Sequence, residues 1–139
     1  MTANPDSSVP IVEHIPDFEV QTLPAPAVEK RSAQRSAVNW RCAVLLKGAR
    51  QPDYGRLKDI SEAGCCMLCH NHPPEGADCD LYVEAIRDGE ILRLVLPAKI
   101  MNVTLAGNIS MFRLGLRVHT SQTADGQTYL RLVRHIQAG

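Results

Sequence analysis

The fold is decided by the stretch CDLYVEAIRDGEILRLVL, residues 79–96. Apolar residues occupy alternate positions on both sides of its centre, at Cys79, Leu81, Val83, Ala85, Leu92, Leu94 and Leu96. This alternation is typical of strands with one face in a core. Asp88-Gly89 at the centre favours a tight turn, because both residues tolerate positive φ. The stretch therefore predicts an antiparallel hairpin, with its second strand running from residue 91 to 103.

The same period of two recurs outward from this hairpin. We expect strands at residues 38–46, 54–60 and 65–69 before it and at 112–118 after it, with turns or loops at 48–53, 70–78 and 106–108. Trp40 falls on the apolar face of the first strand, so we expect it in the core. Pro97 indicates a bend or an edge in the fifth strand, since proline cannot donate to a ladder. Six short strands at regular spacing predict a closed or nearly closed antiparallel barrel.

Helical spacing replaces strand spacing near the C-terminus. Tyr129, Leu130, Val133 and Ile136 lie three or four residues apart, and Thr123 or Asp125 can cap a helix that begins there. We expect this helix to cover an open end or edge of the barrel. The predicted fold class is all-β dominated: a six-stranded antiparallel β-barrel with a C-terminal α-helix and an extended N-terminal tail.

The chain divides by composition into a tail and one domain. Its 139 residues suit a single compact domain. Residues 1–29 contain five of the nine prolines and five acidic residues but no Lys or Arg, and we assign them to an acidic tail. Residues 30–139 contain fifteen basic and ten acidic residues, a net charge of +5. This charge suggests an anionic partner but is too small for a general DNA or RNA binder.

Cysteine usage and apolar runs bear on location. The number of cysteines is odd, and the sequence has neither a signal peptide nor an apolar run of membrane-spanning length. We therefore expect reduced thiols in a cytoplasmic protein without membrane insertion.

The cluster Cys66-x-x-Cys69-His70-x-His72, with Cys79 nearby, has a spacing that zinc accepts. On a strand, however, Cys65 and Cys69 share one face while Cys66 takes the other, so neighbouring ligands would point apart. No orienting acid accompanies a Cys–His pair. We expect no metal, no cofactor and no catalytic residue, and hence no enzyme.

Two short motifs carry the functional prediction. Arg31 and Arg35 lie four residues apart just before the first strand, where two guanidinium groups on a movable arm can close over an anion. Asp59, Ser61 and Gly64 follow the second strand. A carboxylate can accept from the N1–H and amino group of guanine, and a hydroxyl can bond a phosphate or a base. Gly64 lets the backbone come close to a flat ring.

Arg-x-x-x-Arg followed by Asp-x-Ser-x-x-Gly resembles the signature of the PilZ domain family, and the resemblance covers about residues 30–137. It implies a six-stranded barrel with a C-terminal helix that binds the bacterial second messenger cyclic di-GMP. By this resemblance Arg31, Arg35, Asp59, Ser61 and Gly64 contact the ligand. Lys30 before the first motif and Gly115 in a late glycine-containing strand are additional candidates.

The resemblance has two departures. Only Lys30 precedes Arg31, where many family members have a run of basic residues, and no aromatic residue stands near residues 100–102 to stack on a guanine.

The resulting hypothesis is a cyclic di-GMP receptor that changes conformation and signals to a protein partner in motility or biofilm regulation. It acts as a monomer or a homodimer. The alternative is a protein-interaction module that uses no nucleotide. A single-stranded nucleic-acid barrel would need aromatic platforms, and the six aromatic residues are too scattered for that.

Overall fold

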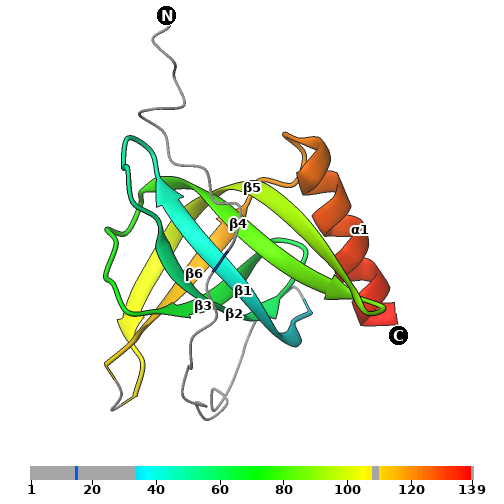
Figure 1. The fold of residues 1–139 in the computed structure, drawn as a ribbon, viewed down its shortest axis with the longest axis horizontal. Helices are drawn as coiled ribbons and strands as arrows, with labels where there is room; N and C mark the ends of the chain where they lie inside the picture. Colours follow the sequence, from blue (N-terminus) through cyan, green and yellow to red (C-terminus); the bar gives the residue numbers. More distant parts are fainter. Residues whose placement is uncertain (1–14, 16–33, 108–109, 139) are drawn as a thin grey trace, which may run out of the picture.

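A computed structural model describes Ile15 and residues 34–107 and 110–138 of the chain. It contains six strands and one helix, coloured along the chain in Figure 1. The elements are β1 (Ser36–Leu46), β2 (Asp53–Ile60), β3 (Gly64–Cys69), β4 (Asp78–Arg87), β5 (Glu90–Leu105), β6 (Phe112–Val118) and α1 (Ala124–Ala138). Every predicted strand is confirmed, with its ends within two residues of those expected.

The strands form a closed barrel in the order β1-β2-β3-β6-β5-β4, and every neighbouring pair is antiparallel. Strand β1 closes the barrel because it pairs with both β2 and β4. The register of β2 against β3 shifts between Leu57 and Asp59. Such a bulge re-aims the side chains that follow it, and here it lies directly before Asp59 near the end of β2.

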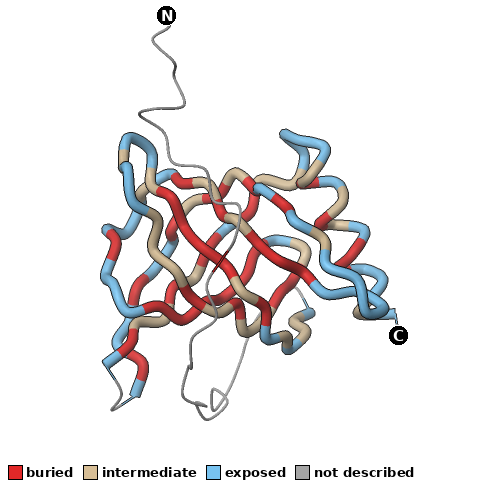
Figure 2. Tube along the Cα trace, in the orientation of Figure 1, coloured by how far each residue is buried: buried red, intermediate tan, exposed pale blue. Residues whose placement is uncertain are grey.

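Alternation along the strands builds the core. Cys42, Val44, Leu57, Leu81 and Leu96 are each fully buried. Figure 2 shows the buried positions concentrated along the strands and the exposed ones at the turns. Trp40 belongs to the core with 5% exposure, as expected.

The hairpin between β4 and β5 has the predicted turn. Asp88 and Gly89 have φ values of 51° and 80°, the two positive angles that a type I′ turn requires. Pairing then continues without a break from Arg87↔Glu90 to Asp78↔Lys99.

Helix α1 covers an edge of the barrel, as predicted (Figure 1). The pairing of β6 with β5 starts only at Ala98, so the first half of β5 pairs with β4 alone. The carboxylate of Asp125 accepts a hydrogen bond of 2.8 Å from the backbone N–H of Val95 on this edge. Pro97, which has no N–H to leave unpaired, lies where the edge ends. Of the two suggested caps, Thr123 is the one used: its hydroxyl accepts from the N–H of Gly126 at 2.9 Å.

The buried face of α1 differs in one position from the expected one. Tyr129 and Val133 are fully buried as predicted, but Leu132 is buried where Leu130 was expected, and Leu130 is half-buried. The face of α1 that packs on the barrel is therefore rotated slightly about the helix axis from the face that the sequence pattern suggested. Among the described residues, no helix is long and apolar enough to cross a membrane.

All five cysteines are free and buried. Burial raises the pKa of Cys42 and Cys65 well above 9.0, that of Cys69 to about 11 and that of Cys79 to about 12. The folded barrel thus holds these thiols in the protonated form.

We predict that stability falls as the pH rises above 9. Unfolded thiols ionise near pH 9 while folded ones stay protonated, so the unfolded chain binds fewer protons and is favoured. Each such thiol costs about 1.4 kcal/mol per pH unit within this window. Urea unfolding under reducing conditions at pH 7.5, 9 and 10 measures the effect, and Cys79→Ala should reduce the slope. A free energy of unfolding that stays constant over this range would contradict the prediction.

Candidate functional site

The turn from Asp59 to Gly64 joins β2 to β3 and is closed by its own polar atoms. The backbone N–H of Ser61 donates to the carbonyl of Gly64 at 2.8 Å, and the N–H of Gly64 lies 3.3 Å from the hydroxyl oxygen of Ser61. Ser61 is only 5% exposed. Its side chain therefore fixes the shape of the turn, and any ligand contact it makes is additional to that role.

Gly64 is required by the packing of the barrel itself. A Cβ atom at this position would lie 2.0 Å from the carbonyl oxygen of Leu116 on the neighbouring strand β6. Its φ is not among the positive ones. The close approach that the sequence suggested is therefore real, but the approaching group in this structure is the backbone of β6.

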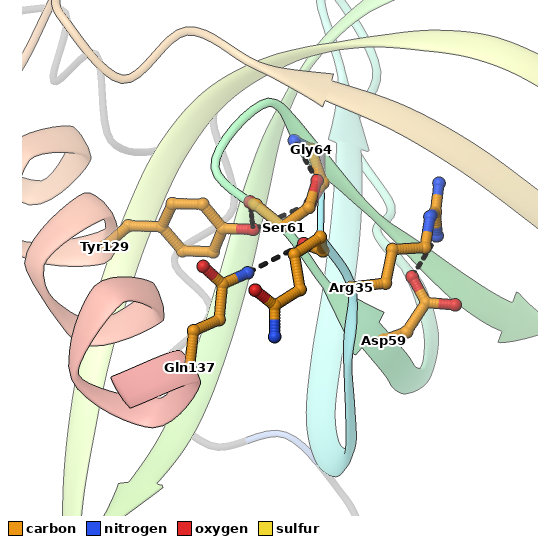
Figure 3. Close-up of polar contacts among 7 residues, drawn as sticks. Arg35, Asp59, Ser61, Gly64, Tyr129 and Gln137 are labelled. Carbon is orange, nitrogen blue, oxygen red and sulfur yellow. Dashed lines mark hydrogen bonds and ion pairs between the residues drawn. The ribbon is translucent and has the colours of Figure 1, made fainter. Parts of the chain in front are cut away.

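Tyr129 of α1 supports the turn from inside the protein (Figure 3). Its hydroxyl lies 2.8 Å from the carbonyl oxygens of both Ser61 and Gly64. Burial raises the pKa of Tyr129 well above 10, so the hydroxyl stays a donor. On the surface, Arg134 of the same helix pairs with Glu62 at 3.2 Å. The helix thus fixes one half of the candidate site.

Arg35 connects the other half. Its guanidinium group forms an ion pair and a hydrogen bond with Asp59, 24 residues along the chain (Figure 3). The two side chains are 21% and 27% exposed. Next to Arg35, the carbonyl of Gln34 accepts a hydrogen bond of 2.7 Å from Gln137 near the end of α1. The structure therefore brings together Arg35, Asp59, Ser61 and Gly64, whereas Lys30 and Arg31 lie outside the described residues.

A row of outward positions crosses the barrel from Asp59. Asp59 pairs with Cys66, Cys66 with Gly115, and Gly115 with Asn102. A Cβ atom on Gly115 would come within 2.8 Å of the Asn102 carboxamide, so the glycine makes room for that side chain. The row spans three strand intervals, about 14 Å, and its middle is formed by two small residues.

Cationic side chains flank this row. Arg117 of β6 is exposed and pairs in register with Gly64, and Arg113 is two positions beyond Gly115 on the same face. The sequence did not predict that Asn102, Arg117, Tyr129 and Gln137 lie beside the motif residues or the row that adjoins them. The alternation of Arg113, Gly115 and Arg117 was a usable signal for the arginines, because alternate residues of a strand share a face.

The cysteine cluster divides between two environments. Cys65 and Cys69 belong to the core, whereas Cys66 lies in the outward row, which is the alternation that the sequence predicted. Within residues 34–107 and 110–138, no three His, Cys, Asp or Glu side chains are grouped as a metal site. The polar groups of the site include the carboxylate of Asp59 and the guanidinium groups of Arg35, Arg113 and Arg117, a set suited to holding a polar anionic ligand.

We predict that Tyr129→Phe weakens the fold by about 1–3 kcal/mol, because the buried turn loses the hydrogen bond from the Tyr129 hydroxyl, although the carbonyl of Gly64 keeps the one from the N–H of Ser61. Urea unfolding measures the loss. Tyr82→Phe is the matched control, since Tyr82 lies on the outer face of β4 and should be nearly neutral. Equal stabilities of the two variants would show that the Tyr129 hydroxyl does not support the turn.

Comparison with known proteins adds a family to this geometry. The PilZ domain family model matches residues 29–135. A search of curated proteins finds no match. Among solved structures, the chain is similar to the Bacillus subtilis inhibitor of motility MotI/DgrA, with 12% identity and a TM-score of 0.63 over 80% of this chain and 52% of that one. The chain therefore spans about half the length of that protein.

Two isolated PilZ domains show the same fold. The PilZ domain of YcgR from Escherichia coli, solved with c-di-GMP, has 17% identity and a TM-score of 0.58 over 79% of this chain and 93% of that one. The PilZ domain of CeSA from a cellulose-synthesizing bacterium has 21% identity and a TM-score of 0.51 over 75% and 98%. Identities this low show the fold alone. The match of the family model over residues 29–135 establishes that the chain belongs to the PilZ domain family.

Proposed function

We propose that this chain is a cytoplasmic receptor for cyclic di-GMP that has no catalytic activity. The observation that carries the proposal is the contact between Arg35 and Asp59, which joins both halves of the family signature at one place. The YcgR PilZ domain, with the same fold, was solved with c-di-GMP. The basic excess of residues 30–139 suits a ligand with two phosphates.

The chemistry of the site assigns a role to each group. Asp59 accepts from the N1–H and amino group of a guanine, and Arg35 and Arg31 bind phosphate or a purine edge. Ser61 and Gly64 hold the turn in shape beside the base. Lys30 and Arg117 add positive charge that favours an anionic ligand. Gly115 has no side chain to obstruct the ligand.

The ion pair between Arg35 and Asp59 defines a closed state. Cys66, which lies next to Asp59 in the row, is only 7% exposed, so little of the row is open to solvent at this point. Nε of Arg35 is buried and has no hydrogen-bond partner in the described part of the chain, so this donor remains available to a ligand. Cyclic di-GMP offers phosphate to the arginine and a guanine edge to the carboxylate, so it competes for both partners of the pair. Exchange of partners would rearrange the arm before β1, and we propose that this change is what a partner protein reads.

Titration calorimetry with cyclic di-GMP on the full chain tests the proposal. Arg35→Ala should weaken binding about tenfold or more, since a charge-assisted hydrogen bond contributes about 1.5–3 kcal/mol. Arg87→Ala, at the distant β4–β5 turn, is the matched control and should bind like the wild type. Folded wild-type protein that fails to bind at tens of micromolar would support the alternative, a protein-interaction module without a nucleotide.

Arg117 gives a second prediction that the sequence motifs do not contain. Arg117→Ala should weaken cyclic di-GMP binding by about 1 kcal/mol, roughly fivefold, because an exposed cation contributes less than a buried one. Arg131→Ala on the exposed side of α1 serves as the control. Identical affinities of the two variants in low salt would remove Arg117 from the site.

A further inference from the structure

Ile15 is buried on a face of the barrel that the nucleotide proposal does not use. It is 2% exposed, although residues near it in the sequence are rich in proline and acid. Ile15 lines a small pocket together with Tyr82, Val83 and Glu84 of β4 and Arg93, Leu94 and Val95 of β5. The candidate nucleotide site instead involves Arg35 before β1, the turn between β2 and β3, β6 and the far part of β5 at Asn102.

The outer face of the β4–β5 hairpin has a layered pattern. Three outward cross-strand pairs follow one another: Tyr82 with Val95, Glu84 with Arg93, and Ile86 with Ile91. Val95, Ile86 and Ile91 are 40%, 52% and 54% exposed. This face therefore has exposed apolar side chains on both sides of the charged pair Glu84–Arg93. Such a surface is suited to binding a segment that is both apolar and acidic.

Glu84 gives this face an unusual centre. Its side chain is 7% exposed, and Oε2 has no hydrogen-bond partner in the part of the chain that the structure describes. The nearest cations are Nε of Arg93 at 3.5 Å and Nη1 of Arg41 at 3.7 Å. Burying a carboxylate oxygen without a hydrogen bond is costly even when a cation lies nearby. A segment that covers Glu84 leaves this carboxylate oxygen without a hydrogen bond. That cost offsets part of the free energy gained from apolar contacts, so the segment binds less tightly than those contacts alone would allow.

We propose that the outer face of the β4–β5 hairpin is a docking surface for the N-terminal segment of this same chain, with Ile15 as its anchor and Glu84 as the group that keeps docking reversible. The segment matches the face in charge, because Glu13, Asp17 and Glu19 surround Ile15 in the sequence while Arg41 and Arg93 flank the pocket. This docking does not depend on cyclic di-GMP binding.

Methyl NMR on the full chain without nucleotide tests the proposal. Methyl-labelled isoleucine, leucine and valine should give cross-peaks from the Ile15 methyl to Val95 and to the Tyr82 ring, with Ile15 assigned through Ile15→Leu. Val95→Ser should move the Ile15 methyl toward its random-coil shift. The matched control Ile91→Ser, on the same strand and face but outside the pocket, should leave that shift in place.

Glu84→Gln tests the centre of the surface. Removing the buried charge lowers the cost of covering this position and makes the face more positive, so the Ile15 methyl should move further from its random-coil shift. A shift toward the random-coil value would refute the role given to Glu84.

Two outcomes would overturn the docking itself. One is an Ile15 methyl without cross-peaks in the folded wild type. The other is a cross-peak between Ile15 and Val95 that persists when half the chains carry only labelled isoleucine and the other half only labelled valine. That result would make the occupant a second copy of the chain.

Discussion

The ion pair between Arg35 and Asp59 is the interaction on which the functional account depends. It spans 24 residues of sequence and joins the segment before β1 to the end of β2. Both side chains are largely covered, so the pair is better shielded from water than a surface ion pair, which typically contributes little. A ligand that supplies a phosphate and a guanine edge can bind Arg35 and Asp59 separately. Such a ligand would open the ion pair when it binds.

Helix α1 supports this ion pair because it contacts the chain next to both Arg35 and Asp59. Tyr129 supports the turn after Asp59, and Gln137 binds the backbone beside Arg35. The start of the same helix satisfies the free edge of β5 through Asp125. A single helix thus covers an edge of the barrel and contacts the segments that carry Arg35 and Asp59.

The sequence was sufficient for the fold because each strand alternates in polarity and the Asp88-Gly89 turn sets the register of its hairpin. It was also sufficient to name the motif residues. It could not supply their surroundings, because these come from pairing between distant strands. Asn102 meets Gly115 across β5 and β6, and the Tyr129 hydroxyl reaches a turn 65 residues away. The sequence allowed several apolar residues of the tail, Ile15 among them, to contact the barrel, but a proline-rich stretch without periodicity could not show that Ile15 is the buried one.

The central claim is that cyclic di-GMP takes over the partners of the Arg35–Asp59 pair. NMR observation of the Arg35 Nε–H and the Asp59 side-chain carboxyl carbon during a titration with cyclic di-GMP tests it most directly, with Arg35→Lys to assign the first signal. The account predicts saturable shifts of both signals with one common dissociation constant. Binding that leaves both signals unmoved would contradict it.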